Sequence, residues 1–255
     1  MAAPELLCLN CDQPLEVGPY CAHCGQQRPH RLSVGHVLHE LLHVFTHADK
    51  SIFGYAGMVL TRPGQLVHDY LRGRRKRYFN PFQILLNTVG IVTLLANGLH
   101  YYDSVGDAVQ QQMSRRVSAA QLHHVQTYFH ALGKYFNVWW LALLPPHALL
   151  TWLVYRRRGL NYAEAFLVQV VVSSAYQVLL LVLLPVLTYL PWRVPGSSMA
   201  MLGGIITVLY LTLVGRQGLG LGWAGAFWRA LVTGILYAII DVLLNYFVFN
   251  WYVFR

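Results

Sequence analysis

The sequence predicts an all-α integral membrane protein with a small metal-binding head at its N-terminus. Charged residues make up 11% of the 255-residue chain and hydrophobic residues 56%, whereas ordinary globular domains carry about 25% charged residues. Five apolar stretches have about the length that a transmembrane helix needs. All four cysteines lie within the first 24 residues. Together these features predict a bundle of about five membrane helices behind a zinc-ribbon-like head.

The cysteines form two Cys-x-x-Cys pairs, made of Cys8, Cys11, Cys21 and Cys24. Two such pairs at this spacing are typical of a zinc site, because each tight turn supplies two thiolates. Four thiolates complete a tetrahedral sphere, so we expect one structural zinc ion without a catalytic role. Residues 1–30, the expected head, are too few for a hydrophobic core and would depend on the metal for stability. The N-terminus has no apparent secretory signal, so we expect the cysteines to lie in a reducing compartment. A metal site is favoured there over a disulfide pairing.

Residues 31–81 are expected to form a cytoplasmic, amphipathic juxtamembrane region. Apolar residues recur there at helical spacing, and Pro63-Gly64 separates a second short helix at residues 65–71. A basic cluster follows at residues 72–77, and its side chains are Arg72, Arg74, Arg75, Lys76 and Arg77. We expect it to contact anionic lipid headgroups, at about 1 kcal/mol for each cation. Nucleic-acid binding is disfavoured because no stacking aromatics alternate with the basic residues.

A transmembrane domain is expected over residues 82–255. Its spans are predicted at about residues 82–102, 136–155, 165–190, 199–214 and 230–252. The fourth is short and contains Gly203-Gly204, so it either crosses as a tightly packed helix or re-enters. Within the loop before the second span, an amphipathic helix is expected to begin near Ser118. Most basic residues lie in segments that five crossings would place on the same side of the membrane as the N-terminus. Because cytoplasmic segments carry an excess of Lys and Arg, this predicts a cytoplasmic N-terminus.

Asp241 is the one acidic residue deep in a predicted span. A carboxylate there is costly, by about 3 kcal/mol or more, so it should be neutral, paired or facing water. One interpretation is a proton or ion relay with His147, which lies beside the Pro145-Pro146 break. The other is an interhelical hydrogen bond that holds the bundle together. The candidate structural partners are Asn87, Asn97, Gln169, Ser173 and Gln177, and Asn245 shares the face of Asp241.

His39-Glu40-Leu-Leu-His43 matches the H-E-x-x-H pattern of zinc peptidases. That chemistry needs two imidazoles one helical turn apart and a glutamate as general base. It also needs a third ligand, and His47 on the same unbroken helix lies too far along the axis, at about 1.5 Å per residue. We therefore favour an interfacial helix whose histidines face headgroups or the head.

Several segments together resemble a known family. They are Tyr20–Gln26 around the second cysteine pair, Thr61-Arg62-Pro63-Gly64, Arg72–Phe82, and Asn161-Tyr162-Ala163-Glu164 before the third span. This series resembles the bacterial domain-of-unknown-function family 3667, polytopic membrane proteins with an N-terminal zinc ribbon. The resemblance covers most of the chain through the third span. It implies a bacterial cytoplasmic-membrane protein and no assigned activity.

The sequence favours a non-enzymatic scaffold or assembly protein whose zinc head binds a protein partner. A small transporter or channel that uses Asp241 and His147 is the first alternative. A membrane zinc peptidase at His39, Glu40 and His43 is the second. Neither a nucleotide-binding loop nor a nucleophile elbow is present. Substrate, partner and oligomeric state do not follow from the sequence.

Overall fold

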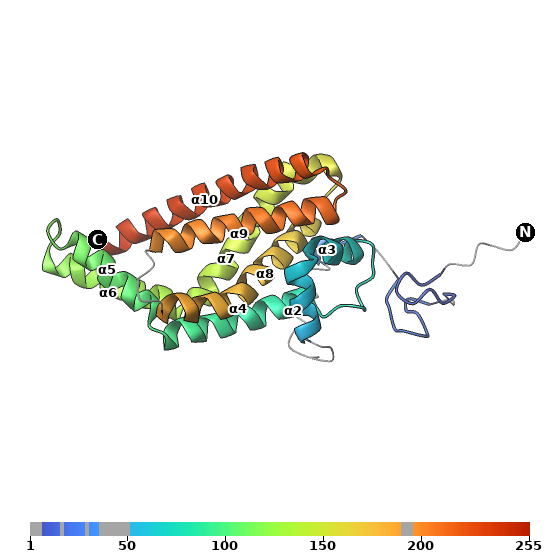
Figure 1. The fold of residues 1–255 in the computed structure, drawn as a ribbon, viewed down its shortest axis with the longest axis horizontal. Coiled ribbons are helices and arrows are strands. Elements are labelled where there is room, and N and C mark those ends of the chain that lie inside the picture. Colours follow the sequence, from blue (N-terminus) through green and yellow to red (C-terminus); the bar gives the residue numbers. More distant parts are fainter. Residues whose placement is uncertain (1–6, 16–17, 29–30, 36–51, 190–195) are drawn as a thin grey trace, which may run out of the picture.

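The computed structural model describes residues 7–15, 18–28, 31–35, 52–189 and 196–255 (Figure 1). Within these ranges the regular structure is helical, apart from two isolated β-bridges in the head (residues 7–28). The predicted all-α class is therefore confirmed. The helices are α2 (Ile52–Thr61), α3 (Pro63–Leu71), α4 (Pro81–Gly98), α5 (Tyr101–Met113), α6 (Ala119–Lys134), α7 (Phe136–Tyr155), the 3-10 turn η1 (Arg156–Arg158), α8 (Tyr162–Tyr189), α9 (Gly196–Gln217) and α10 (Trp223–Val253).

Among the described residues, five helices are long and apolar enough to cross a membrane, namely α4, α7, α8, α9 and α10. Helix α8 lies at the centre of the bundle, where it packs against α4, α7 and α9. Its valine-rich middle, Val170–Val172, is almost completely buried. Helix α10 packs against α9 and α7 but leaves most of its apolar side chains exposed. Because such a surface needs an apolar solvent, the chain is a multi-pass membrane protein.

The fourth apolar stretch forms a continuous helix. Helix α9 has 22 residues, which is about 33 Å at 1.5 Å per residue and enough for about 30 Å of hydrocarbon. It runs beside α10 along the bundle (Figure 1). A Cβ at Gly234 of α10 would lie 2.7 Å from Val208 Cγ2 of α9. The glycine therefore lets these two helices approach closely, as small residues do between membrane helices.

The two ends of the bundle carry different elements (Figure 1). Helices α2 and α3 lie at the end nearest the head, and both pack against α8. Helices α5 and α6 form a hairpin at the opposite end, next to the C-terminus. His124 Nδ1 of α6 lies 3.4 Å from the Val253 carbonyl oxygen of α10. The head and the C-terminus are thus at opposite ends of the bundle, as expected for an odd number of candidate spans.

The first span ends earlier than the sequence analysis places it. Helix α4 stops at Gly98, and His100 adopts a left-handed conformation with φ of 49° before α5 begins. The chain turns there because α5 is polar and packs back against α6. A Cβ at Gly106 would lie 2.9 Å from Phe129 Cβ, so this glycine permits the contact. Helix α6 begins directly after Ser118, which forms a capping box with Gln121.

Candidate functional site

The four cysteines converge at one point of the head. Cys8 Sγ lies 3.7 Å from Cys24 Sγ, and Cys11 Sγ lies 3.7 Å from Cys21 Sγ. All four sulfurs lie within 4.8 Å of one another. Tetrahedral coordination with metal–sulfur bonds of about 2.3 Å separates sulfurs by about 3.8 Å. The donor set and its spacing therefore fit a single metal ion.

The head consists of two equivalent turns. In the first, Cys8 N–H donates to the Gln13 carbonyl and Asp12 N–H donates to the Cys8 carbonyl, each at 2.8 Å. In the second turn the corresponding donors are Cys21 and Gly25. Asp12 and Gly25, one residue after each pair, both have positive φ, of 57° and 67°. Each turn thus points two sulfurs inward, as the two Cys-x-x-Cys pairs predict, whereas the positive φ of Asp12 was not foreseen from the sequence.

The pKa values of the Cys24 and Cys11 thiols are shifted in opposite directions. Burial would raise the pKa of Cys24, but hydrogen bonds from the Gln26 backbone and the Asn10 side chain lower this pKa to about 6. For Cys11, a hydrogen bond from the Gln13 backbone lowers the pKa, but burial and the neighbouring sulfurs outweigh it and raise the pKa to about 12. Metal binding at this site would therefore release protons, because thiolates are the ligands.

The chain around the head contacts the membrane body through several hydrogen bonds. Lys76 N–H donates to Gln26 Oε1 at 2.8 Å, and Gln26 is buried. Arg31 Nε and Nη2 donate to the two carboxylate oxygens of Glu164 at 2.9 and 3.1 Å. Such a bidentate pair combines charge attraction with a defined orientation. The structure thus joins the N-terminal segment to the basic cluster and to the start of α8.

Glu164 also caps α8. Asn161 N–H donates to Glu164 Oε2 at 2.8 Å, and Glu164 N–H donates to Asn161 Oδ1 at 2.9 Å. This reciprocal arrangement satisfies backbone donors at the helix start. Asn161 Nδ2 further donates to the Leu32 carbonyl at 2.9 Å. The Asn-Tyr-Ala-Glu motif therefore both begins a membrane helix and anchors the N-terminal segment.

The basic cluster lies in the loop between α3 and α4. Arg72, Lys76 and Arg77 are exposed, whereas Arg74 and Arg75 are partly buried. The Arg75 guanidinium lies 5.5 Å from the Tyr70 ring centroid. Three of the five predicted headgroup ligands are thus on the surface at the head end of the bundle. The predicted peptidase residues His39, Glu40 and His43 lie outside the described residues.

A second candidate site lies between membrane helices. His147 Nε2 of α7 and Asp241 Oδ1 of α10 are 3.0 Å apart. The His147 ring stacks on Tyr237, with centroids 4.1 Å apart. His147 is buried, and the Asp241 side chain is 37% exposed. Of the partners that the sequence suggested for Asp241, the structure therefore brings His147 into contact.

A polar network continues from this pair toward α8. Tyr237 OH donates to Gln169 Oε1 at 2.9 Å and is hydrogen-bonded to Thr151 Oγ1. Gln169 Nε2 donates to Ser173 Oγ at 3.2 Å. Buried polar groups that satisfy one another in this way reinforce a defined arrangement. Thr151 was not predicted, although it follows His147 by one helical turn.

The other predicted partners of Asp241 lie elsewhere. Asn87 is exposed on α4. Asn97 Nδ2 donates to the Thr93 and Gly133 carbonyls at 2.8 and 3.1 Å. Gln177 is fully buried, and neither of its amide atoms has a hydrogen-bond partner among the described residues. Asn245 remains near Asp241, donating to its carbonyl oxygen at 2.8 Å.

Two adjoining cavities surround the pair. The central cavity, of about 240 Å³, is lined by His147, Gln169, Ser173, Tyr237 and Asp241 among others. The hairpin-side cavity, of about 350 Å³, extends from Asp241 and Asn245 to α5 and α6. Both cavities are lined by Asp241, Trp140 and Tyr176. The carboxylate therefore lies where the two spaces meet.

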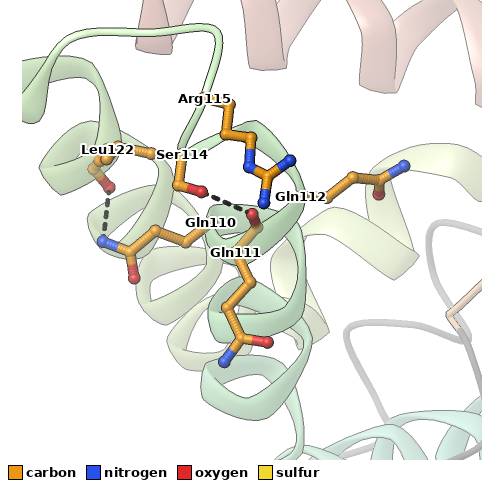
Figure 2. A pocket seen from close by; sticks show the side chains of 6 residues that line it. All are labelled: Gln110, Gln111, Gln112, Ser114, Arg115 and Leu122. Carbon is orange, nitrogen blue, oxygen red and sulfur yellow. Dashed lines mark hydrogen bonds between the residues drawn. The ribbon is translucent and has the colours of Figure 1, made fainter.

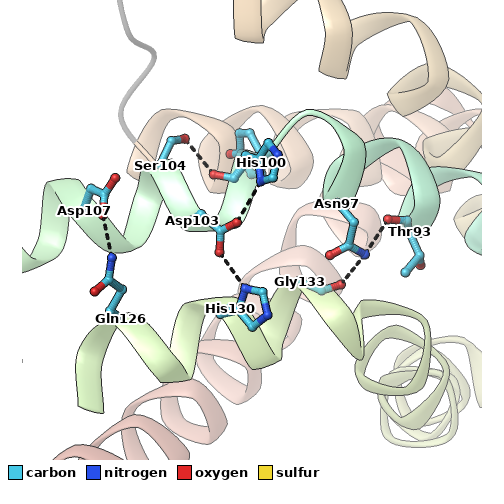
Figure 3. Close-up of polar contacts among 10 residues, drawn as sticks. Thr93, Asn97, His100, Asp103, Ser104, Asp107, Gln126, His130 and Gly133 are labelled. Atoms are coloured by element: carbon cyan, nitrogen blue, oxygen red, sulfur yellow. Dashed lines mark hydrogen bonds and ion pairs between the residues drawn. The ribbon is translucent and has the colours of Figure 1, made fainter. Parts of the chain in front are cut away.

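The α5–α6 hairpin carries further polar contacts (Figure 3). Asp103 accepts from His100 Nδ1 at 3.1 Å and His130 Nδ1 at 3.0 Å. Partial burial would raise the pKa of Asp103, but these hydrogen bonds lower it. Asp107 similarly accepts from Gln126 at 3.3 Å. The His130 and Gln126 bonds join α6 to α5, and none of the four side chains in these two bonds lines the cavities around Asp241.

A larger hollow of about 630 Å³ lies at the tip of this hairpin (Figure 2). It is lined by Gln110, Gln111, Gln112, Ser114, Arg115 and Leu122. The glutamine side chains point in different directions rather than toward a common centre (Figure 2). Binding sites need convergent polar groups, so this hollow is a weaker candidate than the intramembrane cavities.

Fold and site define a multi-pass α-helical membrane protein with a head whose four cysteines could hold a metal ion. A family model described as "Protein of unknown function (DUF3667)" matches residues 58–93. This match supports the resemblance over a short segment, which holds Arg62-Pro63-Gly64, the basic cluster and Asn80-Pro81-Phe82. Comparison with curated proteins and with solved structures gives no match.

Proposed function

We propose that this chain is a transport protein in which the Asp241–His147 pair takes up and releases a proton, so that protons cross the bilayer alone or together with a solute. One observation carries the proposal: the pair joins two candidate spans at 3.0 Å and lies at the junction of two cavities. Intramembrane carboxylates are costly and are typical of ion or proton pathways. A purely structural hydrogen bond would not need the adjoining space.

The same proposal includes location and orientation. The basic cluster at the head end supports a cytoplasmic N-terminus, because cytoplasmic segments carry an excess of Lys and Arg. Exposed Arg72, Lys76 and Arg77 are suited to anionic headgroups at that surface. The family resemblance supports a bacterial cytoplasmic membrane. Zinc is the proposed metal of the head, since four thiolates in tetrahedral geometry favour it.

Proton flux into proteoliposomes tests this function. A pH-sensitive dye is trapped inside, and an inside-negative potential is imposed. We expect acidification faster than in protein-free liposomes, and we expect Asp241→Asn to reduce it to the protein-free rate. The control is Asp103→Asn, which removes an acid outside the candidate spans and should keep the flux.

Thermal unfolding of both variants separates the proposal from a structural role. Asp241→Asn is isosteric, so the unfolding temperature should change little while flux is lost. If the variant instead loses folded protein in proportion to flux, Asp241 is a structural hydrogen-bond partner. Flux that persists in well-folded Asp241→Asn would contradict the proposal.

A scaffold role of the head is the second candidate, and one observation favours it. Leu7, Leu9 and Tyr20 are 50%, 40% and 59% exposed around the metal turns. Exposed apolar side chains grouped on a small module are typical of protein-binding surfaces. A photo-crosslinking amino acid at Tyr20 should therefore give a discrete crosslinked product in cells. The same probe at Val138, which is exposed on α7, should not give that product. The zinc peptidase remains a prediction from sequence alone.

A further inference from the structure

We propose that the two cavities form one chamber for a small organic cation of the ammonium type. This inference rests on the proposed function for its site and names the class of solute. The cavities share Trp140, Leu143, Tyr176, Ala200 and Asp241 as lining residues. A single ligand in the chamber can therefore contact the carboxylate and the aromatic rings together.

Aromatic rings form part of the wall of the hairpin-side cavity. Trp140 and Tyr176 stack with centroids 5.1 Å apart and planes 8° apart. The ring centroid of Phe136 lies 5.7 Å from that of Trp140 and 5.7 Å from that of Tyr102. All four line the cavity. Aromatic faces attract ammonium cations through the ring quadrupole, and several rings together form the cages that recognise quaternary ammonium groups.

The charge of the chamber also favours a cation. Asp241 is the only acidic lining residue, and no lysine or arginine lines either cavity among the described residues. In the part of the chain that the structure describes, His147 is the only basic lining residue, and it contacts Asp241 Oδ1. Asp241 Oδ2 has no hydrogen-bond partner in the described parts of the chain, so this oxygen remains available to a ligand. An anion would meet the carboxylate without a compensating cation.

The volume fits a small molecule. The cavities measure about 350 and 240 Å³, within the range of about 300–1,000 Å³ for ligand sites when they are taken together. Gly203 lets the Tyr176 ring of the wall approach α9 closely, because a Cβ there would lie 3.1 Å from the Tyr176 hydroxyl oxygen. Tyr101 and Tyr102 of α5 line the far end. The chamber thus extends from the middle of the bundle to the α5–α6 hairpin.

The test compares choline with 3,3-dimethylbutan-1-ol, which has the same shape without the charge. Equilibrium dialysis with the full-length protein in nanodiscs of phosphatidylglycerol measures both. We expect choline to bind at least about tenfold more tightly than the alcohol, since a desolvated cation–π contact is worth about 2 kcal/mol. Equal binding of the two would overturn the inference, because the chamber would then be only apolar.

Variants locate the binding. Asp241→Asn and Trp140→Leu should each weaken choline binding by about tenfold, and they should leave binding of the alcohol nearly unchanged. The matched controls are Asp103→Asn on the hairpin and Trp251→Leu, whose side chain is 62% exposed on α10. Because Trp140→Leu keeps Asp241, it tests the inference even if Asp241→Asn does not fold. Loss of choline binding in the controls as well would overturn the assignment.

The ammonium group could belong to a free solute or to a lipid headgroup. Adding phosphatidylethanolamine to the nanodiscs distinguishes them: competition with choline identifies the lipid, and no competition identifies a free solute. The outcomes also separate this inference from the proposed function. Choline binding without proton flux keeps the chamber and removes the proton-linked transport. Asp241-dependent flux without preference for choline keeps the transport and overturns the cation site.

Discussion

Gly64 lets helix α3 meet the C-terminal end of α9. A Cβ at this position would lie 2.5 Å from Gln217 Cβ and 2.7 Å from the Leu213 carbonyl oxygen. Gly64 N–H donates to Gln217 Oε1 at 3.2 Å, and His68 Nδ1 lies 3.2 Å from the Gly218 oxygen. At the residue scale, the Arg-Pro-Gly motif of the family segment therefore serves a close contact between helices.

Replacing Gly64 by alanine should lower stability by about 1–3 kcal/mol, because the new methyl group meets backbone atoms that cannot easily move. Thermal unfolding in detergent, followed by circular dichroism, measures the change. Gly57→Ala is the matched control in α2, where a Cβ would have no neighbour within 4 Å. That control should be stabilising by about 0.5–1 kcal/mol, since alanine favours helix. Equal effects of the two substitutions would refute the contact.

At the element scale, the head is organised by its two cysteine turns rather than by a hydrophobic core. Cys8 and Cys21 are buried, whereas Leu7, Leu9 and Tyr20 beside them are exposed. The turns contribute few apolar contacts of their own, so a bound metal would supply much of the folding free energy of the head. The helices behind the head have their own core, centred on α8.

Purified protein is expected to contain one zinc ion per chain, measured by plasma emission spectroscopy. The Cys21→Ser/Cys24→Ser variant should contain none, because two thiolates cannot hold the ion as four do. Helical content should stay the same, since the membrane helices do not depend on the head. The comparison variant His39→Ala/His43→Ala should keep its zinc. Zinc retained by the serine variant would instead indicate a histidine site.

At the scale of the whole molecule, the five candidate spans separate two surfaces. The head, α2 and α3 lie at one end, and the α5–α6 hairpin and the C-terminus lie at the other (Figure 1). Helix α8 connects both ends through the core, and Glu164 at its start contacts Arg31. A solute in the chamber would therefore approach from the hairpin end, where the cavity is bounded by α5 and α6.

Reporter fusions should place the two termini on opposite sides of the membrane. Green fluorescent protein at the N-terminus should fluoresce in the cytoplasm, and alkaline phosphatase after Arg255 should be active outside. A phosphatase fusion after Gly159, between α7 and α8, should be inactive because two spans return the chain to the cytoplasmic side. An active fusion at Gly159, or an inactive one at Arg255, would contradict five crossings.

Local patterns in the sequence were sufficient for the class of the protein. A Cys-x-x-Cys turn and an apolar run of about 20 residues each depend on neighbours in the chain, so the metal ligands and the membrane helices can be recognised without tertiary structure. The end of the first span could not be predicted in this way. The sequence placed it at Tyr102, whereas the chain turns at His100. His100 is left-handed where α5 begins, and α5 then packs against α6, a contact between helices that a local pattern does not specify.

The sequence by itself determined the four-cysteine head, the basic cluster and the multi-pass membrane body. The sequence also suggested His147 as one of several side chains that could contact Asp241. Only the tertiary structure decided among them, because the two residues are 94 positions apart and their contact depends on how α7 packs against α10. The same packing creates the aromatic chamber, whose walls come from separate helices. Local spacing encodes ligands and spans, whereas contacts between distant segments exist only after the bundle has assembled.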